Sequence, residues 1–187
     1  DDIDLTVTGT LTINQVTSNP GQLIRLSAGE GLVLNTPVDV GTGTVTLETD
    51  GDLILNSVIT AAELVINAST VSQPLNLDIE RLSFNLPAGG NLQVNNAGSL
   101  TLGTANAGGG SINITASSSL QIDGTIAQVQ TLNLSAGTGI STSAGSSLTV
   151  TGNARFSGPS INLGSAQGDS VQLGSLTIVT SGTATVV

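Results

Sequence analysis

Apolar-polar-apolar triplets recur at fixed intervals through the middle of the chain, and this regularity constrains the fold more than any other feature. Between residues 91 and 139 the triplets begin at Leu92, Leu100, Ile112, Leu120 and Leu132. The intervals between these starting positions alternate between a short and a long one, so that every second triplet marks the same point of a longer repeat. A repeat of about 20 residues is typical of a chain that coils into stacked turns, each packing only against its neighbours.

The same repeat extends over both flanks. The earlier triplets begin at Leu5, Leu11, Ile24, Leu32, Val45, Leu53 and Leu64, and the later ones at Leu148, Ile161, Val171 and Leu176. At about 20 residues per turn, residues 1–187 are predicted to form one solenoid domain of roughly nine turns. Residues 71–90 are less regular because two longer alternating runs, 75–79 and 82–86, crowd together. We expect an irregular turn or a short excursion there.

The alternation predicts β-strands whose flanking aliphatic residues point inward and whose middle residue points outward. No segment shows a helical period, and the 24 glycines disfavour helix. The five prolines all lie outside the triplets, as strands bonded on both sides require. A sandwich of antiparallel strands is the competing architecture, but it does not explain so long and regular a repeat. The sequence therefore predicts an all-β fold, a parallel β-solenoid.

The composition removes most residues used in catalysis. His, Cys, Met, Trp, Tyr and Lys are absent, which argues against an enzyme and leaves no cofactor or metal site to nominate. Thirteen acidic residues against Arg25, Arg81 and Arg155 give a net charge of −10, so nucleic acid is excluded as a partner because little would neutralise its phosphates. No apolar run approaches the roughly 18 to 20 residues of a membrane helix, so no membrane insertion is expected.

One cluster of carboxylates invites comparison with β-helix enzymes that cleave polysaccharides. Asp78 and Glu80 share a face by alternation, and Glu63 or Asp123 is expected near them. Such chemistry needs a carboxylate pair held at a defined separation, usually beside a metal, a basic group or an aromatic ring. Arg81 is the only nearby base, and we interpret these residues as solvated charges on an irregular turn.

Three acidic segments offer oxygen ligands for calcium: Asp1 to Asp4, Asp50-Gly51-Asp52 and Gly168-Asp169. None matches a calcium-binding loop motif, and we interpret them as turns. Outward positions carry threonine in part, but asparagine and glutamine interrupt the array that an ice-binding face needs. Asn113 and Asn133 are separated by one repeat, so we expect their side-chain amides to stack along the rod and stabilise it.

The phrases Gly110–Ala116 (GSINITA), Ser119–Ile126 (SLQIDGTI) and Leu132–Ile140 (LNLSAGTGI) resemble the repeats of filamentous-haemagglutinin-like secreted bacterial exoproteins. The resemblance covers most of the chain and implies a right-handed parallel β-helix, exported to the cell surface or the extracellular space as an adhesin or surface filament. The family's secretion domain usually carries an Asn-Pro-Asn-Gly-type motif, whereas this chain has only Ser18-Asn19-Pro20-Gly21. We interpret the chain as repeat region.

Neither Asp1–Val7 nor Thr183–Val187 resembles the caps that close natural solenoids. We therefore expect the first and last turns to continue into further turns or to stack end to end on copies of the chain. The predicted function is a non-catalytic structural segment of an extracellular bacterial adhesin or fibre, with a host surface or glycan as a candidate ligand. The alternatives are a polysaccharide-binding or polysaccharide-cleaving β-helix module and a passenger segment of an autotransporter.

Overall fold

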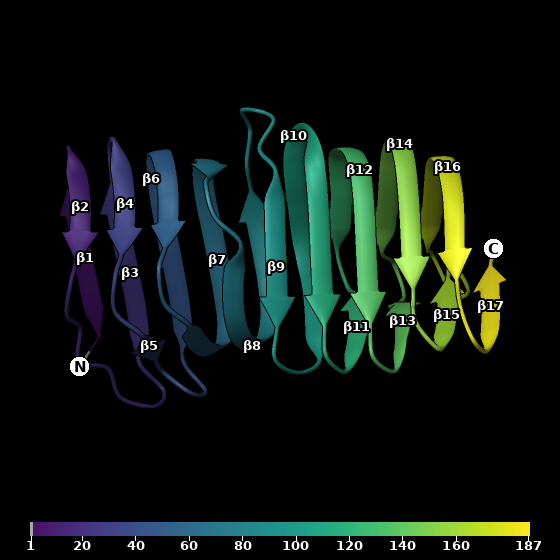
Figure 1. The fold of residues 1–187 in the computed structure, drawn as a ribbon, viewed down its shortest axis with the longest axis horizontal. Helices are drawn as coiled ribbons and strands as arrows, with labels where there is room; N and C mark the ends of the chain where they lie inside the picture. The colour runs from purple at the N-terminus through teal and green to yellow at the C-terminus, as the bar shows by residue number, and fades with distance from the viewer. Residues whose placement is uncertain (1) are drawn as a thin grey trace.

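The computed structural model describes residues 2–187, in which all regular secondary structure is β-strand and every strand pairing is parallel. The strands form a β-solenoid of about nine turns (Figure 1). The predicted parallel solenoid is thus confirmed, and the antiparallel sandwich is excluded. The strands are β1 (Ile3–Val7), β2 (Thr10–Ile13), β3 (Leu23–Ala28), β4 (Gly31–Leu34), β5 (Val38–Asp39), β6 (Thr44–Leu55), β7 (Ile59–Val71), β8 (Leu75–Asn85), β9 (Leu92–Asn96), β10 (Leu100–Ala116), β11 (Ser119–Ile122), β12 (Thr125–Ala136), β13 (Gly139–Thr142), β14 (Ser147–Ser157), β15 (Ser160–Leu163), β16 (Ser170–Val179) and β17 (Thr183–Val186).

The pairing register matches the repeat in the sequence. Stacked turns lie about 21 residues apart along the chain, as the pairing of Ile3 with Ile24 illustrates. The turn from Leu64 to its partner Leu82 is shorter than this, and the turn from Leu132 to Ala154 is longer. Because aliphatic residues lie above aliphatic residues in each pairing, their side chains form continuous columns inside the coil.

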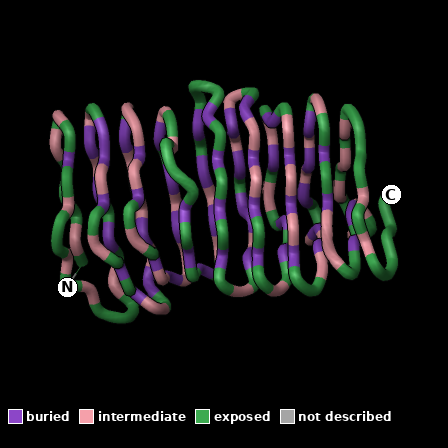
Figure 2. The backbone as a smooth tube through the Cα atoms, in the orientation of Figure 1, coloured by how far each residue is buried: buried purple, intermediate pink, exposed green. Residues whose placement is uncertain are grey.

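The core is the stack of inward-facing aliphatic residues, and buried positions recur along the strands of successive turns (Figure 2). In the middle turns both flanking residues of each triplet are buried, as Leu132 and Leu134 illustrate at 0% and 1% exposure. The polar residue between them, Asn133, is partly exposed. Full burial of one such aliphatic side chain stabilises the fold by about 1.5 to 3 kcal/mol. The inward and outward assignment made from the alternation is confirmed for these turns.

Leu5 and Leu176 depart from this assignment, because both were expected to point into a covered core. They are 38% and 41% exposed. Leu5 lies in β1, which pairs with β3 alone, and Leu176 lies in β16, which pairs with β14 alone. In the described structure a neighbouring turn covers each of these strands on one side only.

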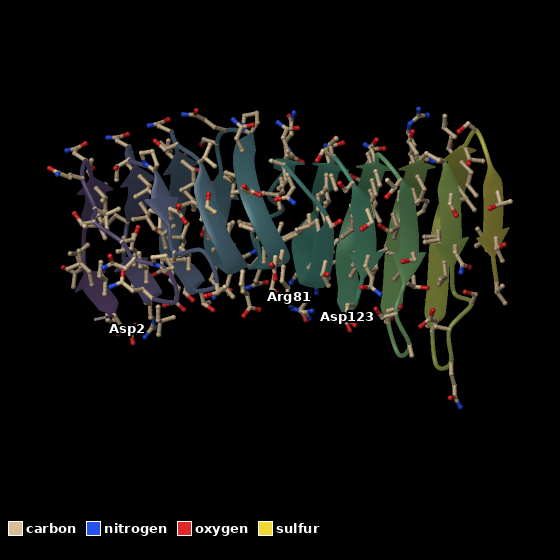
Figure 3. All side chains as sticks on the ribbon, turned by 90° about the horizontal axis from the view of Figure 1, so that it is seen from below. Asp2, Arg81 and Asp123 are labelled. Atoms are coloured by element: carbon tan, nitrogen blue, oxygen red, sulfur yellow. The ribbon has the colours of Figure 1, made fainter. Side chains whose placement is uncertain are left out.

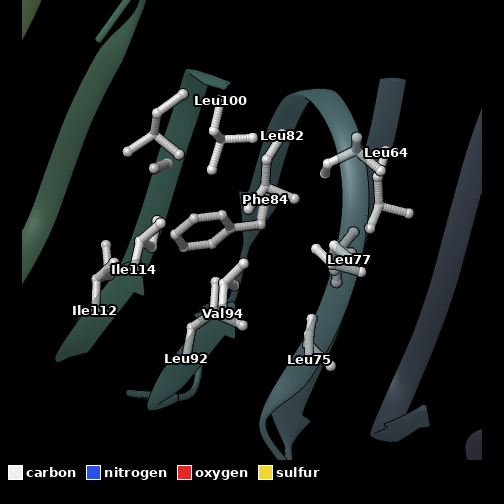
Figure 4. Close-up of a cluster of buried hydrophobic side chains, with 14 of the residues drawn as sticks. Leu64, Leu75, Leu77, Leu82, Phe84, Leu92, Val94, Leu100, Ile112 and Ile114 are labelled. Atoms are coloured by element: carbon white, nitrogen blue, oxygen red, sulfur yellow. The ribbon is translucent and has the colours of Figure 1, made fainter. Parts of the chain in front are cut away.

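Phe84 is the largest side chain in the middle of the core and is 2% exposed. It pairs with Ile66 in the preceding turn and with Ala105 in the following one. Its ring extends from β8 toward the strand that carries Ile114 (Figure 4). The small side chain of Ala105 offsets the volume of this ring, which keeps the aliphatic stack close-packed.

Residues 71–90 contain the long strand β8, which pairs with β7, β9 and β10. The connection from β8 to β9 reaches beyond the ends of the neighbouring turns (Figure 1). Pro74 and Pro87 lie in the connections on either side of β8, and the other three prolines also lie between strands. The placement predicted for the prolines is confirmed.

A corner, meaning a point where the chain turns from one face of the coil to the next, opens midway along the solenoid. It develops between two columns of paired residues, Leu82, Leu102, Ile122 and Thr142 on one side, and Phe84, Ala105, Ile126 and Leu148 on the other. The interval between the columns widens at every step along the chain, from Ser83 alone in the first of these turns to the whole segment 143–147 in the last. The short strands β11, β13 and β15 lie along the edge of the C-terminal half that this corner creates (Figure 1).

A different corner disappears in the same region. Residues 35–37 separate β4 from β5, and residues 56–58 separate β6 from β7. Positions 93–95 correspond to residues 56–58, because Leu77 pairs with Ile59 in one turn and with Asn96 in the next. β9 continues through these positions as an unbroken strand. The N-terminal and C-terminal halves therefore place their corners differently, and the change occurs within β8, β9 and β10.

Candidate functional site

The two carboxylates singled out from the sequence, Asp78 and Glu80, lie on the same surface. Both are exposed and come from β8, where they line an open hollow of about 530 Å³. Hydroxyl groups of Thr42, Thr60 and Ser99 line the same hollow. Among the described residues, this lining includes neither a basic side chain nor an aromatic ring. The arrangement supplies two solvated carboxylates without the partners that acid-base cleavage of a sugar chain uses.

Glu63 and Asp123 are held by Arg81 instead of joining Asp78 and Glu80. The Nη1 of Arg81 lies 2.7 Å from Oδ2 of Asp123, and its Nε lies 3.7 Å from Oε1 of Glu63. Arg81 and Asp123 project from the same side of the coil (Figure 3). The structure thus divides the candidate residues into a pair of solvated carboxylates and an ion-pair cluster.

The hydrogen bond from Arg81 is the main cause of a lowered pKa at Asp123, and a second hydrogen bond, from Ser143, acts in the same direction. A carboxyl group with a lowered pKa accepts a proton poorly near neutral pH, whereas a general base works best with a pKa near the working pH. The chemistry of this cluster is therefore electrostatic and structural: it joins turns of the coil.

Two of the acidic residues considered for calcium, Asp52 and Asp169, use their carboxylates within the protein. Asp52 accepts hydrogen bonds from the hydroxyl groups of Thr70, at 3.0 Å, and Ser72. Asp169 accepts a hydrogen bond from the hydroxyl group of Thr142 at 2.6 Å. In residues 2–187, no three acidic side chains come together as a potential metal site. Of the N-terminal acidic segment, Asp1 lies outside the described residues.

Asparagine side chains form hydrogen-bonded ladders along the outside of the coil. Asn133 donates to Asn113 at 2.6 Å, which confirms the stacking predicted for this pair. Three further ladders follow the same geometry, and they join Asn14 to Asn35 and Asn56, Asn76 to Asn95, and Asn85 to Asn106. The recurrence of asparagine at intervals of about one turn, already visible in the sequence, is the signal that identifies them.

A hollow that the sequence did not reveal is a groove of about 650 Å³ along the corner between β1 and β2 and the matching corners of later turns. We call it the corner groove. Its lining runs from Thr6 in the first turn to Asn85 and Pro87 in the fifth, and it includes the carboxylates of Glu48 and Asp50. Two of its buried residues, Ala28 and Ala68, have short side chains. Ala28 and Ala68 lie two turns apart, with Thr49 at the matching position between them, and these short side chains were the available signal.

Close contact between turns explains part of this shape. A Cβ atom at Gly29 would lie 2.2 Å from the carbonyl oxygen of Thr8, and one at Gly51 would lie 1.5 Å from that of Glu30. Side chains therefore cannot fill these two positions without moving the backbone. The groove offers hydroxyl, amide and carboxylate groups on an open polar surface, which suits weak hydrogen bonding to an extended ligand better than catalysis.

Among the described residues, no helix is long and apolar enough to span a membrane. No protein-family model matches the chain, and neither the curated proteins nor the solved structures contain a significant match to it.

Proposed function

We propose that the chain is a structural, non-catalytic segment of an extracellular bacterial adhesin or surface fibre of the filamentous-haemagglutinin-like kind. The observation that carries this proposal is the parallel ladder that runs from β1 to β17 around one aliphatic core. Each turn of such a coil contacts mainly its neighbours, so the coil lengthens by adding turns without changing its cross-section. A rod of this kind suits a spacer that holds a binding surface away from a cell.

The outermost strands support the second part of the proposal, which is stacking end to end. β1 and β16 each pair on one side, so their outer edges present backbone groups that can pair with a further strand. Aliphatic side chains are exposed on these two strands and on β17, which pairs with β15: Leu5, Leu176, Val179 and Val186. We propose that further turns cover them, either in a longer chain or in another copy of this one.

Sedimentation velocity and cryo-electron microscopy over a range of protein concentrations test whether copies stack. Stacking predicts rods longer than one copy, which lengthen with concentration. Val186→Asp should shorten them to single units, because it places a charge at the apolar end. Val58→Asp is the matched control, since Val58 is 44% exposed in the middle of the coil. Single rods at every concentration would refute stacking of copies and leave continuation within a longer chain.

Antibody labelling tests the proposed location. Antibodies raised against the folded chain should bind intact source cells or shed filaments. Labelling that requires permeabilised cells would contradict an extracellular adhesin or fibre.

The corner groove favours one alternative, a polysaccharide-binding module. An array of neutral and charged glycans should then show binding that the groove variant Asn67→Ala weakens, because Asn67 lies in the groove lining. A screen for lyase and hydrolase activity, with Asp78→Asn and Glu80→Gln as controls, tests the cleaving form of this alternative. Absence of glycan binding and of turnover would remove both forms.

A further inference from the structure

We propose that Arg81 acts as a clasp that couples the N-terminal and C-terminal halves of the solenoid across the turn where their corners change. The backbone ladder is irregular at this place. Leu102 of β10 pairs with Leu82 of β8, but the next pairing joins Ala105 to Phe84. Gly103 and Thr104 therefore lie opposite Ser83 alone, and this bulge interrupts the regular bonding between β8 and β10.

Arg81 bridges the interruption from outside. Arg81 lies on β8, two residues before Ser83 at the bulge. Asp123 lies one turn further along the coil than β10, directly after Ile122, the residue that pairs with Leu102. The Nη1 of Arg81 donates to Oδ2 of Asp123 at 2.7 Å, and its Nη2 donates to the backbone carbonyl of Asp123 at 3.5 Å. These contacts join residues 42 positions apart, or two turns of the coil. On the other side, Glu63 extends the cluster by one turn toward the N-terminus.

Gly103 gives the guanidinium group its path across the intervening turn. A Cβ atom at Gly103 would lie 3.2 Å from Nη2 and 3.3 Å from Nε of Arg81, and 2.4 Å from Oγ of Ser83. A side chain at this position would therefore compete with the arginine for the same space. Because Gly103 has no side chain, the side chain of Arg81 can cross the intervening turn and reach Asp123.

The span distinguishes Arg81 from the other ion-paired arginine. Arg25 binds Glu48 at 2.7 Å, and this pair joins the adjacent strands β3 and β6, whose ladder is regular. The guanidinium groups of both arginines are partly exposed, so the two pairs have comparable contact with solvent. The side-chain hydrogen bond from Asn106 to Asn85 also joins β10 to β8, the two strands at the bulge, but it links adjacent turns only.

A solenoid unfolds as one unit only when the contacts between neighbouring turns are strong enough everywhere. A weakened interface lets the turns on either side open separately. Because the clasp lies at the bulge, its loss should lower the coupling between the halves more than it lowers the stability of either half. The expected result of breaking it is separation of one unfolding transition into two.

Hydrogen exchange and thermal unfolding of the full chain with Arg81→Gln test the clasp. Amide exchange in residues 103–107 should accelerate about three- to tenfold, the range expected for a partly exposed ion-pair network, and the unfolding transition should broaden or split. Asp123→Asn should do the same, because it removes the other charge. Arg25→Gln is the control, and it should speed exchange near β3 without broadening the transition.

Swapping the two charges of the ion pair provides a test that does not depend on lost stability alone. In a Glu63→Gln background, which avoids repulsion between Glu63 and an acidic residue at position 81, the double variant Arg81→Glu with Asp123→Arg should restore part of the exchange protection lost in Arg81→Gln or Asp123→Asn. Equal effects of Arg81→Gln and Arg25→Gln on the width of the transition would overturn the proposal. So would unchanged exchange at residues 103–107 in both Arg81→Gln and Asp123→Asn.

Discussion

The side-chain amide of Asn133 donates a hydrogen bond to Oδ1 of Asn113, one turn earlier, at 2.6 Å. The two residues are also paired in the backbone ladder of β10 and β12. The hydrogen bond between their side chains therefore links, on the outside of the coil, two residues that the backbone ladder already places side by side in adjacent turns. Inside the coil, the flanking residues Leu132 and Leu134 pair with Ile112 and Ile114.

This relationship predicts different costs for neighbouring positions. Leu134→Asp places a charge in the core at a side chain that is 1% exposed, and we expect a loss of at least about 4 kcal/mol, enough to prevent folding. Asn133→Ser removes one amide hydrogen bond and should cost about 1 kcal/mol. Urea unfolding followed by circular dichroism measures both. Similar losses for the two variants would contradict the assignment of inward and outward positions.

The ladder of three asparagines gives an internal comparison. Asn35 lies in the middle, where it donates to Asn14 at 2.8 Å and accepts from Asn56 at 2.7 Å. Asn35→Ala removes both bonds and should lower the free energy of unfolding by about 1 to 2 kcal/mol. Asn14→Ala and Asn56→Ala remove one bond each and should cost about half as much. If all three variants lose the same stability, the ladder does not act as a chain of additive bonds.

The turn-by-turn repeat was predictable because strand alternation and aliphatic columns are both local in sequence. Leu92 and Ile112 pair in adjacent turns, as their spacing indicated, and Leu100 lies in the same core. The stacking of Asn113 and Asn133 followed from the same period. These features depend on each residue's distance along the chain from its counterpart in the next turn.

The corner changes were not predictable from that period, because they depend on how many residues lie between columns. Where one turn has the single residue Ser83, the next turn has two residues, Gly103 and Thr104. This difference shifts one corner without disturbing the triplets on either side. The ion-pair cluster depends on this shift, since Arg81 reaches Asp123 across Gly103. Glu63 or Asp123 was expected near Asp78 and Glu80, whereas both contact Arg81, and the spacing of the triplets does not determine which of these neighbours an acidic side chain meets.

Gly51 provides a test of how closely the turns approach. A Cβ atom there would lie 1.5 Å from the carbonyl oxygen of Glu30, so Gly51→Ala requires the backbone of one turn to move. We expect a loss of about 3 kcal/mol or more in the free energy of unfolding. Thermal unfolding of the variant beside the parent chain measures it.

Gly98→Ala is the matched control for Gly51→Ala. No heavy atom lies within 4 Å of the Cβ position at Gly98, and its φ angle is not positive. Alanine there should be tolerated and should stabilise the fold by up to about 1 kcal/mol, because it restricts the unfolded chain. Equal destabilisation by the two substitutions would show that the spacing between turns is not what Gly51 protects.

Asp169 makes stability depend on pH. Its carboxylate accepts hydrogen bonds from the hydroxyl groups of Thr142, at 2.6 Å, and Ser146, at 3.2 Å, and from the backbone N–H of Ala166, at 3.2 Å. The bond from Thr142 is the main cause of a pKa below the ordinary value of 3.8. Since the folded pKa is lower than the unfolded one, the stabilisation is fully present above about pH 4 and is lost as the pH falls through the folded pKa.

Thermal unfolding between about pH 6 and pH 2 measures this dependence. The melting temperature of the parent chain should fall below about pH 4, and Asp169→Asn should flatten the decline while lowering the melting temperature at neutral pH. Part of the decline should remain, because Asp123 also has a lowered pKa. A decline that is the same in Asp169→Asn as in the parent chain would mean that the bonds from Thr142 and Ser146 do not stabilise the C-terminal turns.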